Sequence, residues 1–223
     1  MSAMRTIRVT GKGALKVHPD MTRVGMMLKG GCPEYRETIR RSSEDTEKLM
    51  DVLAPFGFER SDLKTKDYTI DPENESYEER GVYKSRLVGY KYRHILMVEF
   101  ESDDTLLGRL LYALANSDVR PQLNFSYTVK DLEAVKNRLL GKAVADAKDK
   151  AVVLTEAAGV TLRDIQSIDY SWGQLDLEVR SMNSDIMMDD CFEESMDIGS
   201  YDLGIEPDDI SVSDTVTVVW EIA

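Results

Sequence analysis

Residues 131–159, DLEAVKNRLLGKAVADAKDKAVVLTEAAG, predict the longest helix of this chain. Asp131 suits the N-cap, and Gly159 suits a left-handed residue at the C-terminal end. Side chains at helical spacing mark one face between them: Leu132, Val135, Leu139, Ala143, Ala147, Ala151, Leu154 and Ala158. Because small alanines recur every four residues and nothing polar interrupts the face, we predict that it packs closely on another backbone rather than binding a ligand.

The rest of the chain alternates between strand and helix patterns. Alternating runs at residues 5–10 and about 21–29 flank a link that contains glycine and proline, which predicts a β-hairpin. Helices are predicted from Pro33 to Gly57 and after Ser102. Pro72 is expected to stop the third strand, and a polar loop to follow it. The predicted strands after the hairpin are 64–73, 88–101, 122–129, 164–172 and 210–222.

This order of elements predicts an α+β fold, a two-layer sandwich. The second to fifth strands and their helices follow the order β-α-β-β-α-β, which is typical of a ferredoxin-like unit. The long C-terminal helix and two closing strands extend or cover that unit. We therefore predict one domain over residues 1–223, with an acidic loop excursion at about 176–209.

The charge of the chain is concentrated in that excursion. The net charge is −13, and residues 176–209 hold twelve acidic residues and Arg180 as their one basic residue. This balance argues against a general nucleic-acid or anionic-membrane surface. No apolar run has the roughly 18 residues of a membrane span, and the N-terminus lacks the apolar run of a secretory leader. The sequence as written predicts a cytoplasmic protein, or a periplasmic or exported one if a leader has been removed.

No motif in the sequence predicts catalysis, a cofactor or a metal. Gly11-Lys12-Gly13 fits neither a phosphate loop nor a dinucleotide fingerprint and is assigned to a turn in the hairpin. His18 and His94 are the two histidines, and neither lies in a cluster with metal-site spacing. With no partner nucleophile indicated, we predict that His94 is a packed, hydrogen-bonded strand residue rather than a catalytic base.

Aromatic and basic residues alternate in residues 77–94, YEERGVYKSRLVGYKYRH, and suggest an alternative. Stacking aromatics and cations on a ferredoxin-like sheet are how RRM modules hold single-stranded RNA. The candidate face for RNA or a small ligand consists of Tyr90, Tyr92, Arg93 and His94. The RNP1 signature is absent, however, and alternation places Tyr90 and Tyr92 on the opposite strand face from Arg93, so we predict core packing with a solvated basic face.

The acidic stretch SDIMMDDCFEESMD, residues 184–197, raises a further question. It fails as an EF-hand because its sixth and twelfth positions, counted from Asp185, are Asp190 and Met196. We predict a solvated loop. Methionine adapts to irregular grooves, so the alternative is a partner-docking segment that uses Met187, Met188 and Phe192.

Several short motifs together resemble the SIMPL-domain family, which includes periplasmic immunogenic proteins of bacteria. They are Ile7, Val9, Gly11, Gly13, Pro19-Asp20, GFERSDLKTKDY at 57–68 with Thr65, Tyr90, the alanine ladder of residues 141–160, and IEPDDISVSDTVTVVWEI at 205–222. The resemblance covers nearly the whole chain. It implies an α+β fold and a tendency to self-assemble, and it carries over no catalytic residue.

The sequence therefore predicts a non-enzymatic, SIMPL-like protein that acts through homo-oligomeric assembly or through a protein partner. The apolar alternating strands near both termini have edges that need partners or protection, which also favours a homo-oligomer. A ferredoxin-like binding module for single-stranded RNA or a small ligand is the alternative function, followed by a hydrolase. Neither a membrane span nor a nucleic-acid partner is expected.

Overall fold

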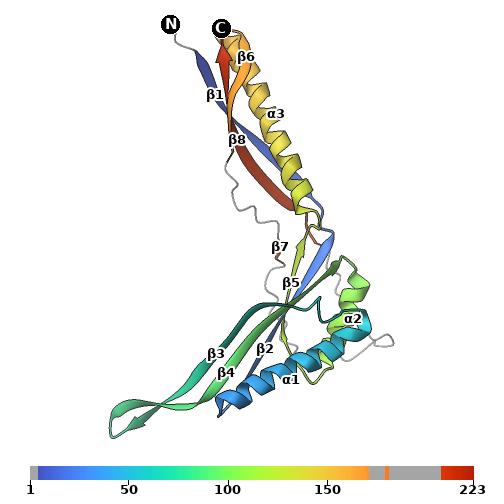
Figure 1. Cartoon of the computed structure of the whole chain (residues 1–223), viewed down its shortest axis with the longest axis vertical. Helices are drawn as coiled ribbons and strands as arrows, with labels where there is room; N and C mark the ends of the chain where they lie inside the picture. Colours follow the sequence, from blue (N-terminus) through green and yellow to red (C-terminus); the bar gives the residue numbers. More distant parts are fainter. Residues whose placement is uncertain (1–4, 171–178, 181–206) are drawn as a thin grey trace. The chain divides into compact units, whose positions relative to one another are not determined.

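The computed structural model describes residues 5–170, 179–180 and 207–223, which fall into two compact units (Figure 1). The first unit has a three-stranded sheet, ordered β1-β8-β6, and one long helix. Its elements are β1 (Thr6–Val17), α3 (Leu132–Ala158), β6 (Leu162–Tyr170) and β8 (Ile210–Ile222). Both neighbouring strands pair with β8 in antiparallel fashion.

The second unit is built on a sheet ordered β3-β4-β2-β5-β7. Its elements are β2 (Met21–Cys32), α1 (Tyr35–Leu53), the 3₁₀ turn η1 (Ala54–Phe56), β3 (Lys64–Glu79), β4 (Val82–Glu101), α2 (Asp104–Ala115) and β5 (Gln122–Thr128), with β7 (Val179–Arg180) beside β5. The chain is thus a mixed α and β protein with two antiparallel sheets, as predicted at the level of fold class. Most of the predicted acidic excursion lies outside the described residues.

The predicted hairpin at the N-terminus is wrong. β1 pairs with β8, whereas β2 pairs with β4, so the two strands belong to different sheets. The link at residues 18–20 passes the chain from one sheet to the other instead of reversing it within one. Gly11 and Gly13 lie inside β1 and not in a turn. Alternation identified both strands correctly but contains no information on which strand each one pairs with.

The predicted polar loop after Pro72 is also wrong. β3 runs through Pro72 to Glu79, and β4 already begins at Val82, so residues 73–89 form a two-stranded ribbon. Arg80 and Gly81 both have positive φ, which is the conformation of a tight two-residue hairpin turn. Pro72 is tolerated because β3 is an edge strand, where a missing N–H group can face away from the ladder.

The glycines of β1 allow α3 to lie directly on the strand. A β-carbon added at Gly11 would lie 2.0 Å from the carbonyl oxygen of Ala143 and 2.4 Å from the backbone nitrogen of Ala147. At Gly13 the same atom would lie 2.3 Å from the carbonyl oxygen of Leu139. Such contacts are impossible for a larger residue, so these positions need glycine for close approach rather than for backbone flexibility.

The helix itself largely matches its prediction. The Asp131 side chain accepts a hydrogen bond from the Ala134 backbone N–H at 2.8 Å, and Gly159 ends the helix with φ of 68°. The C-terminal end of the predicted face is wrong, because Leu154 and Ala158 are exposed and Thr155 is buried instead. The buried residues follow a strict four-residue spacing, namely Val135, Leu139, Ala143, Ala147, Ala151 and Thr155.

Three polar side chains of α3 also cover the outer edge of β1. The Lys12 backbone N–H donates to Asp146 Oδ2 at 2.7 Å, and Lys150 Nζ donates to the same carboxylate at 2.6 Å. These hydrogen bonds hold the pKa of Asp146 below its usual value. Lys142 and Lys150 further reach the backbone carbonyls of Ala14 and Thr10. The edge of β1 that faces away from β8 is therefore already occupied.

We expect Gly11→Ala to destabilise the chain by about 3 kcal/mol or more, because the added carbon must displace helix backbone rather than a flexible side chain. Gly141→Ala is the matched control: nothing lies within 4 Å of its added carbon, and alanine favours a helix by about 1 kcal/mol over glycine. Urea denaturation followed by circular dichroism measures both. A Gly11→Ala chain as stable as wild type would contradict the close contact.

Candidate functional site

One face of the second unit's sheet is covered by helices, and no described helix covers the other, which we call the open face. Val24, Met26 and Leu28 of β2 are buried beneath α1 and α2, in a cluster with Leu49 and Leu110. The alternate residues of the same strands point the other way. The functional candidates therefore divide into those that face the helices and those that stand on the open face.

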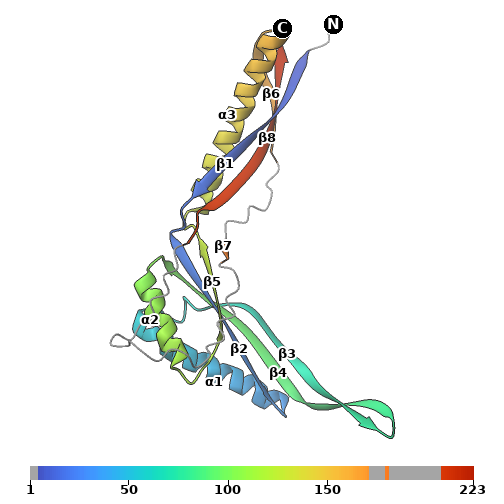
Figure 2. The ribbon, with the colours of Figure 1, turned by 180° about the vertical axis from the view of Figure 1, so that it is seen from behind.

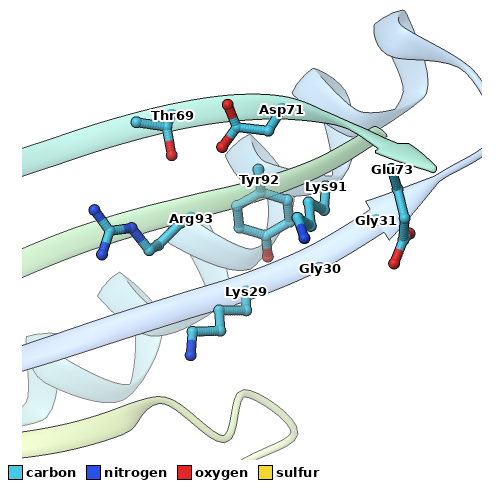
Figure 3. A pocket seen from close by; sticks show the side chains of 9 residues that line it. All are labelled: Lys29, Gly30, Gly31, Thr69, Asp71, Glu73, Lys91, Tyr92 and Arg93. Atoms are coloured by element: carbon cyan, nitrogen blue, oxygen red, sulfur yellow. The ribbon is translucent and has the colours of Figure 1, made fainter. Parts of the chain in front are cut away.

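The open face carries a basin of about 490 Å³ (Figure 3). Cross-strand register explains its shape, because Gly31, Lys91 and Asp71 lie in one row across β2, β4 and β3. Gly31 has no side chain, so it leaves a hollow beside Lys91. The residues that line the basin are Lys29, Gly30, Gly31, Thr69, Asp71, Glu73, Lys91, Tyr92 and Arg93.

Charges of both signs surround this basin. Arg93 pairs with Asp67 at 2.6 Å, and Lys29 Nζ donates to Gln122 Oε1 at 2.9 Å. Asp71 stands beside Lys91 in the same row. The basin brings together groups that recognise charged or polar partners, but it contains no cysteine, histidine or hydroxyl nucleophile paired with a base.

His94 lies on the helix-facing side, away from the basin. Its Nδ1 is 3.1 Å from Thr46 Oγ1 and its Nε2 is 3.0 Å from Thr65 Oγ1. The ring of Tyr68 packs edge-on against the imidazole. Burial lowers the pKa of His94, which favours the neutral ring. His94 is thus a packed, hydrogen-bonded residue, as its sequence context predicted.

Tyr92 and Tyr90 also face the helices. The Tyr92 hydroxyl donates to Asp45 Oδ2 of α1 at 2.5 Å, and burial together with this hydrogen bond raises the pKa of the phenol. The Tyr92 ring lies over Gly30, where an added β-carbon would be 2.6 Å from its Cε1 atom. Tyr90 packs edge-on against Tyr35, with the ring centroids 5.3 Å apart.

The four residues of the candidate RNA or ligand face therefore do not form one surface. Tyr90, Tyr92 and His94 pack against α1 or β3 on the covered side, and Arg93 stands on the open side. Tyr92 is the one aromatic residue among those that line the basin, and its hydroxyl is bonded to α1 on the covered side, so its ring offers no open-face platform for a base to stack on. Met187, Met188 and Phe192 lie outside the described residues.

Sequence reasoning missed the basin. The one signal was the Gly30-Gly31 pair at the end of a strand, since glycine in a strand often marks a close backbone approach. The register that places Gly31 beside Lys91 and Asp71 cannot be read from the chain. Within the ranges that the structure describes, no cluster of three histidine, cysteine or acidic side chains is arranged for a metal, and no helix is both long and apolar enough to cross a membrane.

These features define a class: a mixed α and β protein whose described residues form two antiparallel sheets and three helices. The chain belongs to the SIMPL family of proteins of unknown function (DUF541), whose family model matches residues 7–220. The predicted resemblance is thereby confirmed.

Two curated relatives are similar to this chain. Both are named "26 kDa periplasmic immunogenic protein", one from Brucella melitensis biotype 1 and one from Brucella abortus strain S19. Each is 27% identical to it over 163 residues, which is 73% of this chain. The match spans 65% of the length of either relative.

His94 generates a prediction about pH. Because burial lowers its pKa in the folded state, the unfolded chain binds the proton more readily, and the stability that neutral His94 contributes is lost as the pH falls below about 6.5. We expect His94→Gln to lose less unfolding free energy than wild type between about pH 7.5 and pH 5, measured by urea titration.

Val153→Ser is the control, because the exposed Val153 side chain carries no titratable group. It should follow the wild-type pH dependence. Identical slopes for wild type and His94→Gln would show that burial of His94 does not affect stability.

Proposed function

We propose that this SIMPL-family chain is a non-enzymatic protein that acts by assembling with copies of itself or by binding a partner protein. The observation that carries the proposal is the two-stranded ribbon of residues 73–89 (Figures 1 and 2). β2 pairs with β4 only up to the pair Cys32 and Tyr90. Beyond it, β4 has β3 as its single neighbour among the strands of the described residues.

Large apolar side chains of the ribbon are exposed. The exposed fraction is 80% for Tyr83, 57% for Val82 and 55% for Leu87. A two-stranded ribbon with no third strand is marginally stable in water, and unpaired strand edges are templates for another chain. These features support a role in which the ribbon gains its neighbours by association.

The strand edges of the first unit also favour assembly through the ribbon. The sequence suggested that strands near both termini would offer free edges, but β8 is central in its sheet and the outer edge of β1 is bound by α3. A strand-mediated assembly therefore favours the ribbon over β1.

This proposal includes three finer predictions: the ferredoxin-like unit, the single domain and the cellular location. The order β2-α1-β3-β4-α2-β5, with the sheet order β3-β4-β2-β5, supports a ferredoxin-like reading of the second unit. One family model spans both units, which supports treating residues 1–223 as one SIMPL-like domain. The names of the relatives favour the periplasmic alternative for this chain, and nothing supports the cytoplasmic one.

The basin supports a second candidate, a binding module for a small charged ligand. Three cations, Lys29, Lys91 and Arg93, stand there beside the carboxylates of Asp71 and Glu73. A ligand that carries both a negative and a positive group matches this arrangement. The RNA form of the same alternative has no support, because the aromatic rings of its candidate face are packed against other elements of the unit.

Assembly is tested by shortening the ribbon. We expect wild type to scatter light as a multiple of the 25.2 kDa chain, and a variant with residues 74–88 replaced by Asn-Gly to fall to the monomer mass with its folded core retained. Val153→Ser on the exposed side of α3 is the control, and it should keep the wild-type mass. A wild-type chain that stays monomeric across a wide concentration range would contradict self-assembly.

A further inference from the structure

We propose that the free edge of β4, residues 82–88, accepts residues 73–79 of β3 from a second copy of this chain. This inference rests on the proposed assembly and adds its surface, its direction and its recognition chemistry. The ribbons of successive copies then form one continuous sheet in the strand order β3-β4, β3-β4.

The two edges match in length. The open edge of β4 begins where β2 ends, after the pair Cys32 and Tyr90, and runs to the turn at Arg80 and Gly81. On β3, Pro72 has no backbone N–H to donate, so ladder pairing on the outer edge is interrupted there. The outer edge between Pro72 and the turn is residues 73–79, seven residues that match the seven of β4 between the turn and the buried Gly89.

The charges of the two edges are opposite. The β3 half of the ribbon carries Glu73, Glu75, Glu78 and Glu79, and the β4 half carries Lys84 and Arg86. Within one chain these charges already attract one another, since Arg86 pairs with Glu75 at 2.6 Å and Lys84 with Glu79 at 2.5 Å. Glu73 and Glu78 have no ion pair among the described residues.

Only one of the three possible edge pairings is favourable. Two β3 edges would place carboxylates beside carboxylates, and two β4 edges would place Lys84 and Arg86 beside their own copies. Like charges on adjacent strands destabilise a sheet, whereas opposite charges stabilise it. A β4 edge against the β3 edge of the next copy places each cation between two rows of carboxylates. Charge complementarity thus selects a head-to-tail contact, in which each copy uses two different surfaces.

The same contact covers the exposed apolar side chains. Tyr83 and Leu87 alternate on one face of β4 and are flanked on one side by Glu78 and Asn74 of their own chain. An added strand supplies neighbours on the other side. Adjacent strands lie about 4.8 Å apart, so large side chains of the accepting strand contact both neighbours.

A charge-swap variant tests this inference. The changes E73K, E75K, E78K, E79K, K84E and R86E reverse the charge of both halves of the ribbon and retain the pairs within the chain. Isotope-labelled wild type and unlabelled variant are unfolded together, refolded and examined by native mass spectrometry. We expect each chain to assemble with its own kind, and mixed particles to fall about tenfold below random mixing, because a wild-type β4 edge then meets a basic β3 edge.

The control reverses an exposed pair away from the ribbon, R40E with E44R on α1, and it should mix with wild type at random. Preferential mixing of wild type with the charge-swap variant would mean that like edges pair, and random mixing would mean that the ribbon is not the interface. Either result, or a charge-swap variant that stays monomeric, overturns the inference while the proposed assembly stands. A monomeric wild type overturns both.

Discussion

The contact between α3 and β1 is the constraint on which the first unit depends. Gly11 and Gly13 remove two side chains from the strand, and alanines at four-residue spacing remove bulk from the helix, so the two backbones meet. This closeness also brings Asp146 and its lysine neighbours within reach of the outer edge of β1. The same small residues therefore let the helix pack on the strand and let its polar side chains bond the outer edge of β1, which would otherwise be a template for other chains.

The second unit differs from the first in the exposure of its strand edges. Its core face is closed by α1 and α2, with polar contacts such as Tyr92 to Asp45 between helix and sheet. Its ribbon carries exposed side chains, and Tyr83 is among them. In a single copy such a ribbon adds little stability, because the side chains of the ribbon bury little surface and its outward-facing backbone groups face water. The arrangement is consistent with a chain whose second unit is completed by association.

The sequence predicted the long helix from Asp131 to Gly159 because both caps and a continuous stripe are local features. It predicted the class of the fold for the same reason, since alternation and helical spacing are read residue by residue. It failed for the N-terminal hairpin and for the loop after Pro72, where pairing between distant segments decides the structure. The basin shows the same division: Gly30-Gly31 is visible in the sequence, but the row that joins Gly31 to Lys91 and Asp71 depends on sheet register.

The proposed assembly depends on the free edge of β4 in the ribbon. Its most direct test is amide hydrogen exchange across residues 82–88 at low and high protein concentration. If copies add strands to the free edge of β4, the exchange of these amides slows markedly at the concentration where assembly occurs, while the amides of α3 exchange at an unchanged rate. If the chain assembles and the exchange of residues 82–88 does not slow, strand pairing at the ribbon is contradicted.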